Sequence, residues 1–215
     1  VQNTIRKTCV AVMCADNGVA EEGVASAPQS VTQAQTINFT RRLTGVGALA
    51  ESFRSDLLIV DLGVKDPIPR ELYTHTPLED THKIVNRRLR PGTWNIAKVP
   101  AMTEREALQC IETGIEMADA LREHGYDLIG AGEMGIGNTT TSAAVLSALT
   151  GLSAEDTCGR GGGVNDMGFL RKKEIVDAVS APYRKAAYGE QLEDLTDVRT
   201  TVLDILATVG GFDIC

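Results

Sequence analysis

The stretch Asp127-Leu-Ile-Gly-Ala-Gly-Glu-Met-Gly-Ile-Gly-Asn-Thr-Thr-Thr141 decides the fold, because it joins a short apolar run to a helical pattern through four glycines. Glycine lets the backbone turn tightly and approach a ligand without a Cβ clash. We therefore predict a strand, a tight turn, and a helix that begins near Asn138. Free N–H groups at such a helix start, with Thr139 and Thr140 beside them, suit a phosphate or a carboxylate.

An acidic residue, Glu133, lies inside this expected anion site. A carboxylate there costs free energy unless it orients or deprotonates another group, so Glu133 is a candidate catalytic residue. The stretch matches neither the dinucleotide-binding fingerprint nor a Walker loop, because no lysine follows Gly137. The plainer alternative is a tight strand-to-helix turn that carries a solvated glutamate.

Two further apolar runs, over 9–15 and 57–62, end in turns that contain Gly or Asp and lack strict alternation. With the run at 127–131, they are typical of fully buried parallel strands, although short apolar runs can also be pieces of helix. Helical patterns separate the three runs. This alternation predicts a doubly wound, mainly parallel α/β fold of three layers, whose sheet is incomplete if it has three strands only.

The expected helices have recognisable start and stop signals. Ser30 and Gln33 have the spacing of a capping box, and so do Thr103 and Glu106, while Gly125 can end the second helix. Residues 63–102 are rich in proline and show no clear element, so we interpret them as a long functional excursion. We expect helices over about 30–52, 103–125 and 138–149, and two more around 170–179 and 198–209.

Charge and composition exclude several classes of function. The net charge of −8 argues against a nucleic-acid or anionic-membrane surface, but not against a small phosphorylated ligand held by backbone amides. The apolar share of 43% is enough for a packed core, and no apolar run approaches the roughly 18 residues of a membrane span. The five cysteines have no CxxC spacing, which favours a reduced, cytoplasmic compartment. The three histidines have no ligand spacing, so we expect no metal and no cofactor.

A second glycine-rich segment, Gly159-Arg-Gly-Gly-Gly-Val164, is followed by Lys172 and Lys173. Consecutive glycines with a basic side chain again favour an anionic ligand, and the alternative is a flexible surface loop. The Asp16-Asn17-Gly18 sequence follows the first expected strand, at the sheet edge where ligands bind, but it is more simply a plain turn. Trp94 could stack on a flat ring, although packing under a loop is the simpler role.

Taken together, these segments resemble one family, the nicotinate-nucleotide:dimethylbenzimidazole phosphoribosyltransferases of cobalamin nucleotide-loop synthesis. The matching stretches occur in family order and are CADNGVAEEGV, PQSVTQAQ, TGVGALA, DLGV, NIAKVPAMT, GAGEMGIGNTTTSAA, GRGGGV and VGGFDI. The resemblance covers nearly the whole chain, which corresponds to only the middle of the family's length. It implies a single α/β core domain over 1–215, truncated at both ends relative to the family and usually part of a homodimer.

The resemblance implies transfer of phosphoribose from nicotinate mononucleotide to 5,6-dimethylbenzimidazole or a similar base, with inversion at the anomeric carbon and no metal. By position, Glu133 matches the family's acid near the incoming base and ribose. Lys173 is the rival of Lys172, and Ala27, next to Ser26, stands where some relatives have a serine. The implied substrate-binding residues are Gln35, Gly135, Gly137, Asn138, Thr139, Thr140, Gly161, Gly162 and Lys172.

The resemblance also places the family's general-base glutamate in a Gly-Glu-Gly segment beyond the VGGFD stretch. The 215 residues alone are therefore expected to be inactive or nearly so. Two alternatives stay open: a paralogue that glycosylates another base, and a subunit that binds a nucleotide without turnover. The leading hypothesis is a cytoplasmic enzyme with small-molecule substrates and without nucleic-acid or membrane partners.

Overall fold

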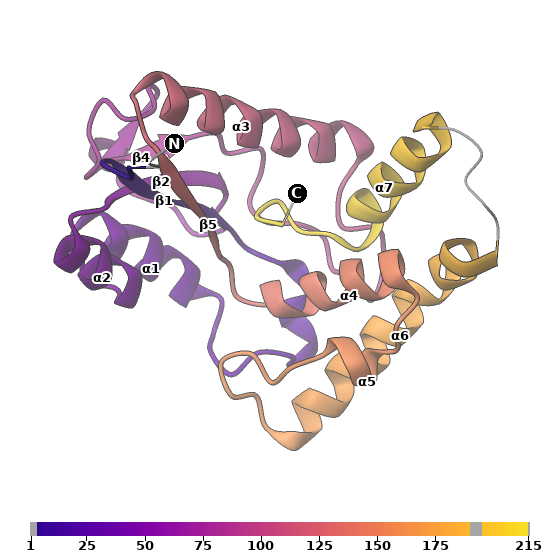
Figure 1. The fold of residues 1–215 in the computed structure, drawn as a ribbon. Coiled ribbons are helices and arrows are strands. Elements are labelled where there is room, and N and C mark those ends of the chain that lie inside the picture. The colour runs from indigo at the N-terminus through magenta and orange to yellow at the C-terminus, as the bar shows by residue number, and fades with distance from the viewer. Residues whose placement is uncertain (1–3, 190–194, 215) are drawn as a thin grey trace.

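The computed structural model describes residues 4–189 and 195–214, which form a parallel five-stranded sheet between helices (Figure 1). The strand order is β3-β4-β2-β1-β5. Every pairing is parallel, which confirms the predicted doubly wound α/β class. The strands are β1 (Thr8–Ala15), β2 (Asp56–Gly63), β3 (Tyr73–Thr74), β4 (Ile84–Asn86) and β5 (Leu128–Met134).

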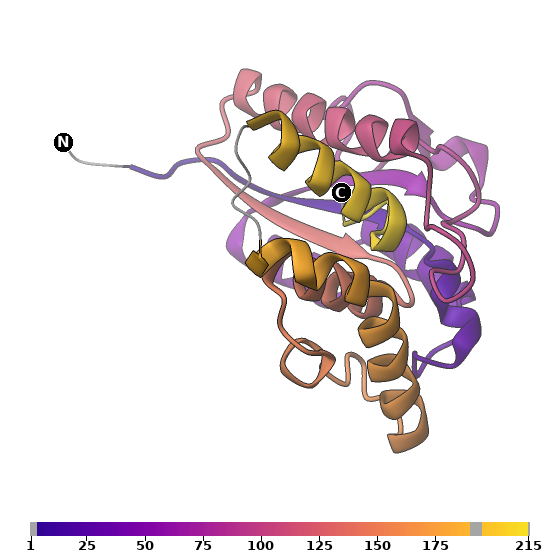
Figure 2. The ribbon, with the colours of Figure 1, turned by 90° about the vertical axis from the view of Figure 1, so that its right-hand side faces the viewer.

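Helices cover both faces of the sheet, as Figures 1 and 2 show. Helix α3 (Glu104–Glu123) lies on one side with α7 (Leu195–Val209), and α1 (Ser30–Thr40) and α2 (Gly45–Phe53) lie on the other. Alternate residues of β2 enter two separate apolar clusters. Leu58, Val60 and Leu62 pack with residues of α3, whereas Leu57 and Ile59 pack with Phe39 and Ala50 of α1 and α2.

The remaining helices extend from the carboxyl side of β5. Helix α4 (Asn138–Thr150) begins at the predicted residue and packs against α6 (Asp166–Gly189), with the short α5 (Ala154–Thr157) between them in sequence. The capping box at Thr103 and Glu106 is formed, and Gly125 follows the end of α3 with a left-handed φ of 75°. The side chain of Val198, part of the predicted last helix, lies outside the described residues.

The prediction of one helix over 30–52 is wrong. The chain leaves the helix after Thr40, and α2 starts with Thr44 as its N-cap, where the Thr44 side chain accepts a hydrogen bond from Gly47 N. Arg42 between them has a left-handed φ of 58°. The expected capping box at Ser30 is also absent, because Gln29 is the N-cap residue and its side chain makes no cap hydrogen bond.

The excursion at 63–102 contains structure that the sequence analysis missed. Strands β3 and β4 lie in it and extend the sheet beyond β2, and two single-turn 3₁₀ helices, Gly18–Glu22 and Arg70–Leu72, were missed as well. Strands of two or three residues are too short to show a hydrophobic period. The sheet is therefore larger than the three strands that were predicted.

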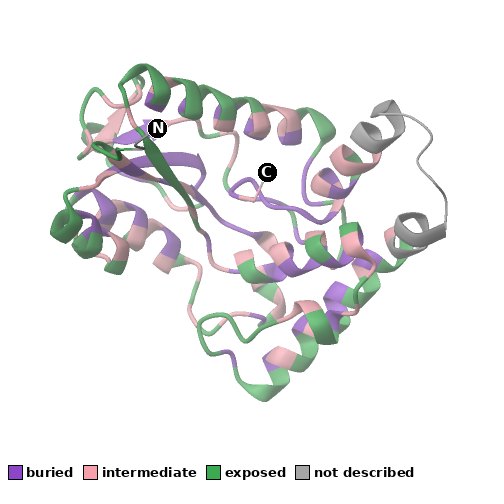
Figure 3. Cartoon of the chain, in the orientation of Figure 1, coloured by how far each residue is buried: buried purple, intermediate pink, exposed green. Residues whose placement is uncertain are grey.

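Strand β5 differs from the buried strand that was predicted. It pairs with β1 on one side, and no described strand pairs with its other edge. Leu128 is 51% exposed and Ile129 is 41% exposed, and Figure 3 shows most of this strand as exposed. Its apolar run thus has the composition of an interior strand in an edge position.

Three further observations concern the described part of the chain. Cys9, Cys14, Cys110 and Cys158 form no disulfide, and Cys215 lies outside the described residues. Within 4–189 and 195–214, no helix has the length and apolarity that crossing a bilayer requires. The same ranges contain no cluster of three or more His, Cys, Asp or Glu side chains that could hold a metal ion.

Candidate active site

Two parallel strands bring two loops together at one edge of the sheet. Strands β1 and β5 are in register, with Cys14 opposite Met134, so the residues after each strand lie side by side. Gly135 packs closely against the end of β1 and against the segment after α7. A Cβ at Gly135 would lie 2.0 Å from Ala15 O and 2.4 Å from Asp213 Oδ2. Gly137, with a φ of 95°, is the N-cap residue of α4. Both glycines are therefore required by the backbone of the turn.

The start of α4 satisfies its own N–H groups, contrary to the expectation of free donors. Thr139 N donates to Asn138 Oδ1 (2.7 Å), and Thr140 N donates to Gly137 O (2.9 Å). The backbone N–H of Ile136 donates to Thr32 Oγ1 (3.0 Å). The first two bonds are local to the turn and the start of the helix, and the third joins the turn to α1. An anion here must rely on other donors.

Lys172 supplies such a donor, because it joins the two glycine-rich segments. Its Nζ donates to Thr139 Oγ1 (2.8 Å) and to Gly159 O (2.9 Å). The side chain is fully buried, forms no salt bridge among those found in the described residues, and has its pKa lowered by burial. A buried ammonium without a carboxylate partner favours an anionic ligand. Lys173 instead pairs with Glu155 at 2.7 Å, and so it points to a different partner.

The second glycine-rich segment lies directly against the first. Gly161 has a φ of 53°, and a Cβ there would lie 2.8 Å from Thr139 Oγ1. Gly162 O accepts a hydrogen bond from Ser26 Oγ (3.0 Å), which links the segment to the chain before α1. The two segments predicted to grip one anion are thus neighbours, and Thr139 lies between them. Because its oxygen accepts from Lys172, the Thr139 hydroxyl keeps its proton for a ligand.

Glu133 lies at the end of β5 and is oriented by the start of α4. Asn138 Nδ2 donates a hydrogen bond to Glu133 Oε2. Glu133 and Asp213 both line a cavity of about 340 Å³, together with Met13 and Phe212 among others. Desolvation raises the pKa of Glu133, and the hydrogen bond from Asn138 opposes this rise. Glu133 is therefore a carboxylate with a fixed orientation at a cavity, as a proton acceptor would need to be.

Asn17 is a central site residue that the sequence analysis interpreted as part of a plain turn. It is fully buried, and its Oδ1 accepts from Thr141 Oγ1 at 3.2 Å. Its Nδ2 donates to both carboxylate oxygens of Asp213, at 3.4 and 3.3 Å. One amide thus joins the ends of β1 and the start of α4 to the segment after α7. No local pattern could have shown this, because the partners lie 124 and 196 residues away.

Two predicted site residues have less direct roles in this arrangement. Thr140 is fully buried, and its Oγ1 has no hydrogen-bond partner. Gln35 is half-buried on α1, one turn beyond Thr32, whose oxygen binds the 135–138 turn. Residues three apart share a helix face, so Gln35 lies on the side of α1 that faces the turn.

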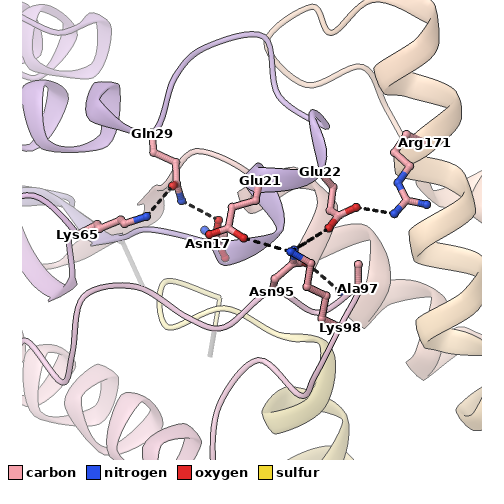
Figure 4. Close-up of polar contacts among 9 residues, drawn as sticks. All are labelled: Asn17, Glu21, Glu22, Gln29, Lys65, Asn95, Ala97, Lys98 and Arg171. Carbon is pink, nitrogen blue, oxygen red and sulfur yellow. Dashed lines mark hydrogen bonds and ion pairs between the residues drawn. The ribbon is translucent and has the colours of Figure 1, made fainter.

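A second and larger cavity, of about 570 Å³, lies between the end of β1 and residues 90–99. Figure 4 shows the polar contacts around it: Gln29 binds Asn17 O (3.1 Å), and Lys65 binds Gln29 Oε1 (3.3 Å). Trp94 stacks against the guanidinium of Arg90, 4.0 Å from the ring centroid, but it is 46% exposed, so the expected packing under a loop is wrong. Most of the polar groups here bind one another, so this cavity is a weaker candidate than the Lys172 site.

Comparisons with known proteins show the family of the chain. A family model described as phosphoribosyltransferase (DBI_PRT) matches residues 1–215. The chain is 44% identical over 210 residues to a nicotinate-nucleotide–dimethylbenzimidazole phosphoribosyltransferase from Ruminiclostridium cellulolyticum, covering 98% of this chain and 53% of that protein. It is 40% identical to the protein of the same name from Clostridium tetani, over 100% of this chain and 53% of the relative.

A solved structure gives the same result for the fold. The crystal structure of CobT from Thermus thermophilus superposes with a TM-score of 0.81 at 33% sequence identity. The match covers 98% of this chain and 56% of that one. The chain therefore spans about half the length of the curated relatives it matches.

Proposed function

The chain belongs to the phosphoribosyltransferase family whose model matches it from end to end, and we propose that it is the core domain of an enzyme that transfers phosphoribose from nicotinate mononucleotide to 5,6-dimethylbenzimidazole or a similar base. The products are α-ribazole 5′-phosphate and nicotinate, as in cobalamin synthesis. The relatives carry the name of this reaction. The observation in the structure that supports it best is Lys172, which is buried between two adjoining glycine-rich segments.

The 5′-phosphate of the mononucleotide is placed against Lys172, the Thr139 hydroxyl and the 159–163 segment. The Lys172 ammonium offers its remaining N–H, and Thr139 offers its O–H. Gly161 and Gly162 let the backbone approach the phosphate closely. Fixing the phosphate in this way positions the anomeric carbon, which is most of what a displacement with a good leaving group requires.

The transfer breaks the bond from C1′ to the nicotinate nitrogen, whose electron pair leaves with nicotinate. A ring nitrogen of the base forms the new bond to C1′ from the opposite face, which inverts the configuration. The base must then lose the proton of its other ring nitrogen. Glu133, oriented by Asn138, is the described carboxylate that is placed to accept a hydrogen bond from the base or the ribose.

The proposal also includes the cellular location, the class of substrate and the assembly of the protein. We place the protein in the cytoplasm, which agrees with four cysteines that form no disulfide. The net charge of −8 supports small-molecule substrates in preference to nucleic acid. The resemblance supports a homodimer and the use of 1–215 as one domain of a longer protein.

Binding of the mononucleotide tests the proposal directly, because the residues proposed to hold its phosphate lie within this chain. Isothermal titration of the chain with nicotinate mononucleotide should show one site, with Lys172→Met weakening binding about 10- to 100-fold, the range for a hydrogen bond to a charged group. Lys173→Met is the matched control, because that lysine pairs with Glu155 on the surface. Equal affinities for Lys172→Met and the parent chain, or tighter binding of AMP than of nicotinate mononucleotide, would contradict the proposal.

A further inference from the structure

The carboxyl group of Asp213 is built into the site without a basic partner. Asp213 is 7% exposed, and its side-chain donor is the neutral amide of Asn17. Two glycines make room for it: a Cβ at Gly135 would lie 2.4 Å from Asp213 Oδ2, and a Cβ at Gly211 would lie 2.6 Å from Asp213 Oδ1. Among the salt bridges of the described residues, none includes Asp213. Within the part of the chain that the structure describes, Asp213 is therefore an enclosed acid that forms no salt bridge with a cation.

A second acid faces the same space. Glu133 and Asp213 line one cavity of about 340 Å³, and the other lining residues, among them Met13, Leu62 and Phe212, carry no positive charge. When two carboxylates face one cavity, ionisation of one disfavours ionisation of the other, and the effect is greatest for a carboxyl that is enclosed.

We infer that Asp213 and Glu133 form an acid pair that holds a single proton at neutral pH, with the proton on Asp213 and the charge on Glu133. The assignment within the pair follows from their surroundings. Asp213 is enclosed, whereas Glu133 is exposed at the rim and accepts the hydrogen bond from Asn138, which stabilises its ionised form. Asp213 is in this view a positioning residue, because it acts through the charge state of Glu133.

The other titratable and charged groups around Asp213 support the same assignment. Cys14 of β1 and Asp16, which follows that strand, interact with it electrostatically, and Cys110 of α3 lines the shared cavity. The nearby cation is Arg90, which lies 4.9 Å from the centroid of the Phe212 ring and is paired with Glu106. Burial, followed by the charge of Glu133, raises the pKa of Asp213 to about 8.

The pair has a consequence for ligand binding, and this part rests on the proposed function. Below a pH of about 8 the pair carries one negative charge, and above it the pair releases its proton and carries two. The second charge lies against Gly135, in the turn that leads to Thr139 of the site proposed for an anionic mononucleotide. Binding of nicotinate mononucleotide should therefore weaken as the pH rises through about 8.

Carboxyl titration by ¹³C NMR of the chain without ligand tests the pair by itself. We expect one aspartate carboxyl to titrate near pH 8, to be missing in Asp213→Asn, and to shift down by about one pH unit in Glu133→Gln, which removes the neighbouring charge. Glu133 is at the surface, so Glu133→Gln keeps the test valid even if Asp213→Asn fails to fold. Asp119→Asn, on the exposed face of α3, is the control and should leave this titration unchanged.

An Asp213 carboxyl that titrates below about pH 5, or that does not respond to Glu133→Gln, overturns the pair. Titration calorimetry with nicotinate mononucleotide on both sides of pH 8 gives the second measurement. We expect affinity to fall on the alkaline side in the parent chain and to stay level in Asp213→Asn, and a fall of the same size in both overturns the role in binding. Absence of binding at every pH contradicts the proposed function, while the NMR titration still decides the pair.

Discussion

The two glycine-rich segments look alike in sequence, yet different physical requirements shape them. The turn at 135–137 is closed in by neighbours, because a Cβ at Gly135 would lie 2.0 Å from Ala15 O. In the segment at 159–163, a Cβ at Gly159 or Gly163 would meet no atom within 4 Å. The first segment needs glycine because its neighbours leave no space, and the second uses glycine mainly for backbone freedom. Similar composition can thus meet a packing requirement in one place and a conformational requirement in another.

The largest expected effect on stability comes from replacing one glycine of each segment by alanine. Gly135→Ala should destabilise the chain by more than about 3 kcal/mol or prevent folding, because backbone atoms cannot move aside as a flexible side chain can. Gly159→Ala should change stability by less than about 1 kcal/mol, since its Cβ would meet open space. Urea unfolding followed by circular dichroism measures both. Similar losses in the two variants would remove the distinction.

An intermediate effect is expected at Gly161, where the second segment touches the first. Gly161→Ala should cost about 1–2 kcal/mol, because its φ of 53° is unfavourable for a side chain and its Cβ would lie 2.8 Å from Thr139 Oγ1. In a Thr139→Ala background the clash is absent and only the backbone cost stays. Urea unfolding of the four chains in this double-mutant cycle separates the two causes. An equal cost in both backgrounds would show that the contact with Thr139 contributes nothing.

The smallest effect is expected at Ser26, which holds the outer side of the second segment. Ser26→Ala removes one hydrogen bond to Gly162 O, and a bond of this kind at the surface contributes about 0.5 kcal/mol. Its affinity for nicotinate mononucleotide should stay within about twofold of the parent chain, as titration calorimetry can show. A tenfold loss would mean that the outer contact, and not Lys172, sets the position of the segment.

Much of the fold could be predicted because its signals are local. The apolar runs of β1 and β2, the glycines before α4 and the capping box at Thr103 each specify a short segment without help from the rest of the chain. The break between α1 and α2 could not be predicted, since a left-handed Arg42 has no sequence signature. The exposure of β5 depends on which strands lie beside it, and its own residues do not encode this.

The candidate site likewise contains some features that local sequence signals could predict and others that they could not. Gly135 and Gly137 form the predicted turn before α4, because a glycine turn is recognisable in a single segment. Lys172 joins the two glycine-rich segments, and its choice over Lys173 rested on the resemblance and not on a local pattern. The free N–H groups expected at the start of α4 are absent, because Asn138 and Gly137 use them internally. Asn17 and Asp213 were not recognised as partners, since their contact exists only after the chain has folded.

The three-way junction at Asn17 also determines the order in which the protein can be assembled. The Asn17 side-chain amide bonds Thr141 and Asp213. Its hydrogen bonds can therefore form only after loops of 124 and 196 residues have closed. Closing long loops is slow, because chain entropy is lost before the contacts are made. During synthesis on the ribosome, β1 and β2 can pair early, whereas the junction at Asn17 can close only after the segment that follows α7 has left the exit tunnel.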